Sequence, residues 1–331
     1  MWLLEYQMLG WGDQDASASR SAEFGGRVGG GGRGRHARLE RIERLIDWTA
    51  LAAVVAPIYA APTGRPSYPP LLMVRALLLQ QWYGLSDPGL EEALADRLSF
   101  RRCVGLALDQ PVPDHATLWR FRQQLAERDL AGELFAAVER QLDGLGLVVK
   151  QGTLVDASLV AAQVRPPRPG AGLESPADPD ARWSRDATGK HFGYKAQVGV
   201  DQGSRLIRRA TLTPGNVNQT VVADALIAGD ERAVYADKAY DTQARRRRLK
   251  AAGIKDRILH RPHKSRPLSA RQRRRNRLIG PLRAAVEPLF GTLKRSYGWA
   301  RVRYRGLAAN AAHFQLLCLA CNLRRAEVLT R

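Results

Sequence analysis

The stretch Leu147-Val-Val-Lys-Gln-Gly-Thr-Leu-Val-Asp-Ala-Ser-Leu-Val160 decides how this chain folds. It is apolar and rich in β-branched residues, which predicts a buried β-strand. The strand nevertheless carries one acid, Asp156. A carboxylate inside an apolar strand is costly unless it is paired or coordinates a metal, so Asp156 is a candidate functional residue.

Two further acids are candidates for one site together with Asp156. Asp237 ends a second apolar strand, Ala233-Val-Tyr-Ala-Asp237, and Glu287 lies on a predicted helix. If the two strands are neighbours, both carboxylates point from one sheet edge, and a helix across that edge adds Glu287. Converging carboxylates need a cation, and hard oxygen ligands favour Mg²⁺ or Mn²⁺. We expect a phosphodiester-cleaving centre with two ions about 4 Å apart.

The strands around these acids predict an α/β layer. Residues 191–200 and 206–213 alternate like strands, and a turn separates them. A helix over about 221–227 then leads to a strand over 232–237. Strands that can run antiparallel, followed by a helix and a further strand, favour a mixed sheet over a Rossmann repeat.

Composition divides the chain into three parts. Residues 1–37 are rich in glycine and predict a disordered leader. Residues 38–145 have a helical pattern, and residues 146–331 hold the strands and the three acids. The most apolar stretch, 71–85, is interrupted by polar residues and is shorter than the roughly 20 residues of a membrane span. We therefore expect a core helix there and no membrane partner.

Polar caps mark helix starts in the 38–145 part. Ser86 or Asp87 can cap a helix with Pro88 in its first turn, and Asp114 can open another. Arg120 and Arg122 lie on the helix that Asp114 opens. Successive short helices ending in such a pair form either a helix-turn-helix that enters a DNA groove or an ordinary bundle, and the sequence favours neither.

The chain is strongly basic. It has 52 Lys and Arg against 32 Asp and Glu, a net charge of +20, which favours a polyanion such as nucleic acid as partner. Residues 242–301 alone hold 19 Lys or Arg and two acids, a net +17. A charge run is usually a solvated face, but this one flanks Asp237 and Glu287, which favours DNA binding. The three cysteines cannot form a disulfide framework, in agreement with a reducing cytoplasm.

Cations surround the acids. Arg283, Glu287 and Lys294 are spaced by four and seven residues, so they share one helix face and the two cations can hold phosphates. On spacing alone, a surface salt bridge between Arg283 and Glu287 is favoured over that role. Lys195 and Lys238 fall near the predicted site, where each contacts DNA or lines a strand end.

Other polar residues have simpler interpretations. Asp201 reads as a turn residue and Asp241 as a helix cap. Tyr240 is close to the predicted site, and its role stays open between a DNA contact and a strand end. His260 and His263 lack further ligands in their loop. Cys318 and Cys321 follow an apolar helical pattern, which favours helix packing over a zinc site.

Eight short motifs follow one another along most of the chain. They are Gly64-Arg-Pro-Ser-Tyr68, Leu79-Gln-Gln-Trp-Tyr-Gly-Leu-Ser-Asp87, Pro113-Asp-His-Ala-Thr-Leu118, Val155-Asp156-Ala-Ser, Gly193-Tyr-Lys-Ala-Gln-Val-Gly-Val-Asp201, Thr213-Pro-Gly-Asn-Val-Asn218, Tyr235-Ala-Asp237-Lys-Ala-Tyr240, and Arg283-x3-Glu287-x6-Lys294. Together they resemble the DDE transposases of bacterial insertion sequences, in the IS-four and IS-five grouping, and the first three resemble the IS-five type. Gly280 stands where that family's signature has tyrosine.

The resemblance implies an RNase H-like catalytic domain after an all-helical domain for end-DNA recognition and dimerisation. It implies that Asp156, Asp237 and Glu287 bind two Mg²⁺ or Mn²⁺ ions. The implied activity is cleavage at element ends and transfer of the 3′-OH to target DNA, by a homodimer or larger synaptic complex in the bacterial cytoplasm, associated with the nucleoid. The alternatives are a metal-dependent nuclease of the same fold and an inactive, transposase-derived DNA-binding regulator.

Overall fold

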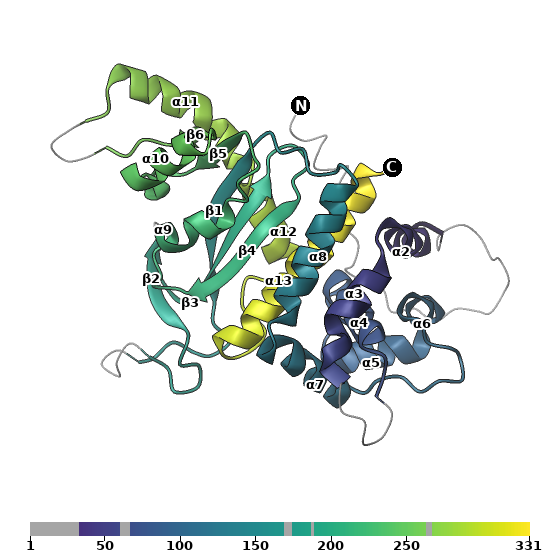
Figure 1. Ribbon diagram of the computed structural model, residues 1–331. Helices are drawn as coiled ribbons and strands as arrows, with labels where there is room; N and C mark the ends of the chain where they lie inside the picture. Colours follow the sequence, from purple (N-terminus) through teal and green to yellow (C-terminus); the bar gives the residue numbers. More distant parts are fainter. Residues whose placement is uncertain (1–32, 60–66, 169–173, 187–188, 263–266) are drawn as a thin grey trace, which may run out of the picture.

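The computed structural model describes residues 33–59, 67–168, 174–186, 189–262 and 267–331 (Figure 1). Helix α2 (Arg33–Leu45) begins inside the leader that the sequence predicted over 1–37, and the remainder of that leader lies outside the described residues. None of the helices in these ranges combines the length and apolar character needed to cross a bilayer.

A run of helices occupies the chain up to residue 144. Its elements are α2, α3 (Trp48–Val55), the 3-10 helix η1 (Ala56–Tyr59), α4 (Pro70–Tyr83), α5 (Asp87–Asp96), α6 (Leu98–Val104), α7 (His115–Glu127) and α8 (Leu130–Gly144). Both predicted caps are present: the Ser86 hydroxyl accepts from the N–H of Gly89 at 3.0 Å, and the Asp114 carboxylate accepts from the N–H of Thr117 at 2.6 Å. Local sequence signals therefore set these helix starts.

A six-stranded mixed sheet follows. Its strands are β1 (Thr153–Ala161), β2 (Arg182–Asp186), β3 (Gly189–Asp201), β4 (Ile207–Pro214), β5 (Ala233–Ala236) and β6 (Lys255–Ile258). Strand β3 pairs antiparallel with β1 on one edge and with β2 and β4 on the other, whereas β1, β5 and β6 are parallel neighbours. The predicted fold class, a mixed sheet flanked by helices and preceded by a helical part, is confirmed.

Helices cover both faces of the sheet (Figure 1). On one face, α9 (Gln219–Val222), η2 (Ala223–Leu226) and α10 (Gln243–Ala251) enclose a small core against β1, β5 and β6. The 3-10 helix η3 (Lys238–Tyr240) follows β5. The second, larger core includes residues of α11 (Ala270–Ala284), α12 (Glu287–Arg295) and α13 (Leu307–Leu329).

Helix α13 joins the helical part to the sheet. It packs against α2, α4, α7 and α8 on one side and against β4 on the other, within one continuous core. The indole N–H of Trp82 donates to the carbonyl of Ala320 at 2.9 Å. The Asn322 amide accepts from the N–H of Ile207 at 2.8 Å and donates to the carbonyl of the same residue at 2.7 Å. The two parts of the chain are therefore packed as one body.

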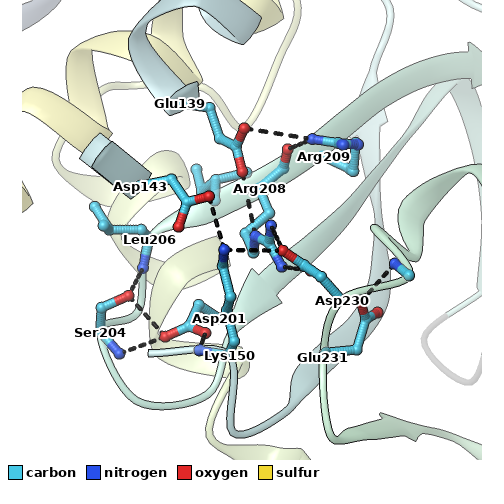
Figure 2. A network of polar contacts seen from close by, with 12 residues as sticks. Glu139, Asp143, Lys150, Asp201, Ser204, Leu206, Arg208, Arg209, Asp230 and Glu231 are labelled. Atoms are coloured by element: carbon cyan, nitrogen blue, oxygen red, sulfur yellow. Dashed lines mark hydrogen bonds and ion pairs between the residues drawn. The ribbon is translucent and has the colours of Figure 1, made fainter. Parts of the chain in front are cut away.

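A polar network also ties α8 to the sheet (Figure 2). Arg208 of β4 is 3% exposed; its Nε lies 3.2 Å from Oε1 of Glu139, and its Nη2 lies 3.0 Å from Oδ2 of Asp230. Lys150 Nζ lies 2.8 Å from Asp143 and 3.1 Å from Asp230. Every charged group named here has an opposite charge beside it, which is what burial requires. The network holds the start of β5, and so the site at its far end.

Candidate active site between β1, β5 and helix α11

Asp156 and Asp237 come together because β1 and β5 are parallel neighbours. Val155 lies opposite Ala236 in the ladder, and the next residue of each segment is one of the two acids. Asp156 is 9% exposed, and burial raises the pKa of its carboxyl, with the nearby Asp237 carboxylate adding to the rise. The predicted pairing of the two strands is confirmed.

Glu287 enters the site from a helix that differs from the prediction. The sequence predicted one helix through Arg283, Glu287 and Lys294, whereas α11 ends at Ala284 and α12 begins at Glu287. The break follows from Pro288, which has no N–H to donate to the Ala284 carbonyl and whose ring conflicts with it. The single-helix prediction is therefore wrong. The two residues between the helices keep helical torsion angles, so Arg283 still lies one turn before Glu287.

Arg283 holds two of the acids with one guanidinium. Its Nη2 lies 2.8 Å from Oδ2 of Asp156, and its Nη1 lies 3.0 Å from Oε1 of Glu287. Burial acts to lower the pKa of Arg283, but Asp156, Asp237 and Glu287 outweigh it and raise the pKa. The surface salt bridge that spacing allowed is thus present, and it extends to a buried strand carboxylate. Arg283 is the common neighbour of all three acids.

Tyr240 borders the same acids. Its side chain is 1% exposed, and its hydroxyl has no hydrogen-bond partner among the described residues. Burial raises the pKa of this phenol, and the negative charges of Asp156 and Asp237 add to the rise. Because its side chain is buried, Tyr240 lies behind the two aspartates and is not an exposed DNA contact in this structure.

The site has the donors for a divalent cation without a closed cage. No three His, Cys, Asp or Glu side chains in the described part of the chain are close enough to hold a metal ion, and the Glu287 side chain is 62% exposed. The donors themselves fit Mg²⁺ or Mn²⁺, because carboxylate oxygens are the ligands these ions prefer. In this structure the guanidinium of Arg283 supplies positive charge between the Asp156 and Glu287 carboxylates. Asp156, Asp237 and Glu287 are therefore the residues that would hold such ions.

Arg122 does not lie where the sequence predicted. Its side chain is 5% exposed, its Nη2 lies 2.6 Å from Asp87, and its guanidinium lies 4.8 Å above the Tyr304 ring. With its side chain buried against these partners, Arg122 holds α7 in place and is not a DNA contact in this structure. Arg120 is exposed on the same helix, beside Trp119, which is 52% exposed.

Lys195 is also corrected. It pairs with Leu159 across the β1–β3 ladder, whereas Asp156 pairs with Val198. Cross-strand partners share a face and successive residues alternate, so Lys195 lies on the opposite face of the sheet from Asp156. Its Nζ donates to the carbonyl of Val217 at 2.7 Å, and burial lowers its pKa. We assign it to holding the segment after β4.

The other predicted cations lie near the acids. Lys238 is exposed and directly follows Asp237, in η3. Lys294 lies in the last turn of α12, seven residues after Glu287, so these two residues share a helix face. The structure therefore brings both lysines to the ends of elements that carry catalytic candidates.

The remaining polar predictions have mixed outcomes. Asp201 is a turn residue, as predicted: its carboxylate accepts from the N–H and the hydroxyl of Ser204, both at 2.8 Å. The cap of α10 is Thr242, one residue after the predicted Asp241, which instead pairs with Arg246. His260 lies 3.2 Å from Arg246, and His263 lies outside the described residues.

The C-x-x-C pair packs as predicted. Cys318 is fully buried and Cys321 is partly buried, both in α13, and neither belongs to a group of possible metal ligands among the described residues. Burial raises the pKa of Cys321 to about 12. Both thiols therefore serve the core.

Comparison with known proteins identifies the family of this chain. Over residues 149–323 the chain matches a family described as "Transposase DDE domain", and over residues 33–124 it matches one described as "Transposase domain (DUF772)". The first match spans all three acids and Arg283. The chain is also similar to piggyBac transposase in a synaptic complex with hairpin DNA, determined by cryo-EM, at 11% identity over 89% of this chain and 75% of that one, with a TM-score of 0.42. The chain belongs to the DDE transposase domain family, of the insertion-sequence type.

Proposed function

We propose that this chain is the transposase of a bacterial insertion sequence of the IS-five-like group. It binds the terminal inverted repeats of its element, hydrolyses the phosphodiester bond at each end and transfers the freed 3′-OH to target DNA. The observation that supports this most is the gathering of Asp156, Asp237 and Glu287 around Arg283, in a chain of the DDE family.

Asp156, Asp237 and Glu287 would hold two Mg²⁺ or Mn²⁺ ions. When bound, such ions polarise phosphate oxygens and lower the pKa of water. The protein contributes position: β1 and β5 fix two carboxylates on paired strands, and α12 brings the third from an exposed first turn. A separate protein base is unnecessary, because phosphoryl transfer relies on positioning and electrostatics.

The first chemical step hydrolyses a phosphodiester bond, and the second exchanges one phosphodiester bond for another. In the first, water attacks the phosphorus at the element end and the bond to the 3′ oxygen breaks, which leaves a 3′-OH and a 5′-phosphate. In the second, that 3′-OH attacks a target phosphate and a target 3′-OH leaves. Neither step needs an oxidant or a reductant, so one site serves both.

Cations near the site would bind the DNA. Lys238 is exposed and directly follows Asp237, and Lys294 lies in the last turn of the helix that Glu287 begins. Arg283 contacts phosphate once it is released from Asp156. The helical part, with Arg120 exposed on α7, recognises the element end. Because two ends must be joined, the active species is a homodimer or a larger synaptic complex, in the bacterial cytoplasm and associated with the nucleoid.

A cleavage assay on a duplex that carries the element's own end tests the proposal. Purified protein should nick this duplex with Mg²⁺ or Mn²⁺ but not with Ca²⁺, and then join the 3′ end to a second duplex. Asp156→Asn, Asp237→Asn and Glu287→Gln should each abolish nicking while DNA binding persists. Asp109→Asn changes an exposed acid in a turn between α6 and α7 and should leave nicking unchanged.

The outcomes separate the proposal from its alternatives. Nicking without joining would assign a nuclease, and specific DNA binding without nicking would assign a regulator. Normal nicking by any of the three site variants would show that the active site lies elsewhere.

A further inference from the structure

The solvent side of α11 carries four exposed arginines, Arg271, Arg273, Arg274 and Arg277, which we name the basic face. The sequence of this 15-residue helix contains no acid. No ion pair joins any of the four to a carboxylate among the described residues. Their charge is therefore left without a protein counter-charge.

Other arginines of the same region are neutralised inside the protein. Arg275 turns inward from α11 and lies 3.5 Å from Asp256. In α10, Arg245 is buried with its Nε 2.7 Å from Asp224, and Arg246 lies 2.7 Å from Asp241. The +17 segment therefore contains an inner set of arginines that holds β6 and α10 together, and the basic face is separate from it.

The inner residues of α11 fix the direction of the basic face. Arg275, Ile279 and Arg283 are spaced by four residues and lie on one helix face. Ile279 is 4% exposed in the large core, and Arg283 reaches Asp156. Arg273, Arg274 and Arg277 lie on the other side of the helix and turn outward, whereas Arg271 is exposed at the helix start, one turn before Arg275. Helix α11 stands at the β6 end of the sheet, far from α2–α7 (Figure 1). The basic face ends about two turns of helix before the active-site arginine.

The spacing of the basic face suits a phosphate backbone. Arg271 to Arg277 spans about 9 Å along the helix axis at about 1.5 Å per residue. One DNA strand has a phosphate for every 3.4 Å or so of duplex axis, so the face covers about three successive phosphates. Arginine is suited to these groups because its planar guanidinium donates two parallel hydrogen bonds.

We propose that the basic face of α11 binds the phosphate backbone of the duplex DNA that enters the Asp156 site. This inference rests on the proposed function and specifies how its DNA is held. The contact is independent of base sequence, so it serves end DNA and target DNA alike. It also accounts for four exposed arginines that the protein leaves without counter-charges among the described residues.

Two exposed leucines lie next to the basic face, and they suggest a different binding partner for this surface. Leu278 is 68% exposed and Leu282 is 45% exposed, one turn apart on α11. A second copy of the chain could cover them. A two-fold contact would place the same patch on both sides, however, and so bring two sets of unpaired arginines together. Like charges disfavour that contact, whereas DNA phosphates complement it.

The test compares two triple variants by DNA binding. Arg271→Gln/Arg274→Gln/Arg277→Gln removes three charges from the basic face, and Arg44→Gln/Arg102→Gln/Arg140→Gln removes three exposed charges from α2, α6 and α8. Fluorescence anisotropy with a short mixed-sequence duplex, at about 50 to 200 mM NaCl, gives the slope of log affinity against log salt. The α11 variant should lower that slope by about 3, at about 0.9 per phosphate contact, and the control by less than one.

Further outcomes bear on the proposal directly. Arg271→Lys/Arg274→Lys/Arg277→Lys should keep most of the slope, which shows that α11 still folds. Equal losses in the two glutamine variants would overturn the proposal, since net charge alone would then explain binding. A change in oligomeric state with unchanged DNA affinity would also overturn it and assign the face to a second copy.

The proposed function can fail separately. A protein that binds DNA through α11 but does not nick element ends keeps this inference and loses the catalytic proposal. A protein that nicks normally after losing the basic face, with unchanged affinity and salt slope, gives the opposite result.

Discussion

Arg283 and Asp156 are 127 residues apart in sequence, and their side chains meet at 2.8 Å. The same guanidinium reaches Glu287, and its Nε is buried with no partner among the described residues. A single arginine thus provides the positive charge that these carboxylates require. A divalent ion that binds the same oxygens has to replace it.

Removing Arg283 should therefore strengthen metal binding. Arg283→Ala takes away the competing cation, and we expect the dissociation constant for Mn²⁺ to fall about tenfold, or about 1.4 kcal/mol. Isothermal titration calorimetry without DNA measures this directly. Arg283→Lys keeps the charge and loses the two-pronged contact, so its affinity should lie between the two. Unchanged or weaker Mn²⁺ binding in a folded Arg283→Ala variant would show that arginine and metal do not compete.

Arg122 and Arg120 should behave as opposites. Arg122→Ala leaves Asp87 unpaired, and we expect a loss of about 2 kcal/mol of unfolding free energy, below the value for a fully buried pair because the Asp87 side chain is 25% exposed. Arg120→Ala should change stability by less than about 0.5 kcal/mol. Urea denaturation measures both, and DNA-end binding should weaken for a folded Arg120→Ala variant. Equal stability of the two variants would contradict the burial of Arg122.

Gly280 offers a stabilising substitution. It lies inside α11, and a Cβ added there would meet no atom within 4 Å apart from its two chain neighbours, one of which is Pro281. Gly280→Ala should raise the unfolding free energy by at most about 0.5 kcal/mol, because the gain from glycine's greater loss of backbone freedom is offset in part by contact of the new Cβ with the Pro281 ring. Gly193→Ala is the contrasting control, since its φ is +155° and a Cβ would clash with the carbonyl of Val160. Thermal unfolding should show opposite shifts for the two variants.

Stability should depend on pH through Asp230. Hydrogen bonding from Arg208 and Lys150 lowers the pKa of Asp230 to about 2, against about 3.9 in an unfolded chain. The stabilisation is present above about pH 4 and is lost as pH falls toward 2, because the folded state must then accept a proton that its partners disfavour. Asp230→Asn should be less stable than the native chain at neutral pH, and this difference should shrink below pH 4. A difference that stays constant with pH would assign it to lost packing.

The candidate acids could be found from sequence because each breaks a local rule. Asp156 interrupts an apolar strand, and Asp237 ends another, so their cost pointed to a function. Arg122 gave no such signal, because its partner Asp87 lies 35 residues away and only the packing of α5 on α7 brings them together. The position of Lys195 could not be predicted, because the register between two paired strands decides which face of the sheet a side chain lies on. One strand's sequence does not show that register.

The fold was predicted where apolar residues dominate and was missed at the sheet edges. Strands β2 and β6 read Arg-Trp-Ser-Arg-Asp and Lys-Asp-Arg-Ile, which carry little strand signal because edge strands tolerate charge. The break before α12 did have a signal in Pro288, one residue after Glu287. The spacing of Arg283 and Glu287 still holds, because helical torsion angles at the two intervening residues carry it across the break.

Helix α13 has a consequence for how the protein is made. The helices of the N-terminal part bury their apolar faces against a segment that is synthesised last among the described elements. During translation, which proceeds at about 5–20 residues per second, α2–α8 wait with that surface uncovered for the fifteen seconds or so that the remaining chain requires. We expect nascent chains of this protein to need chaperones until α13 leaves the ribosome.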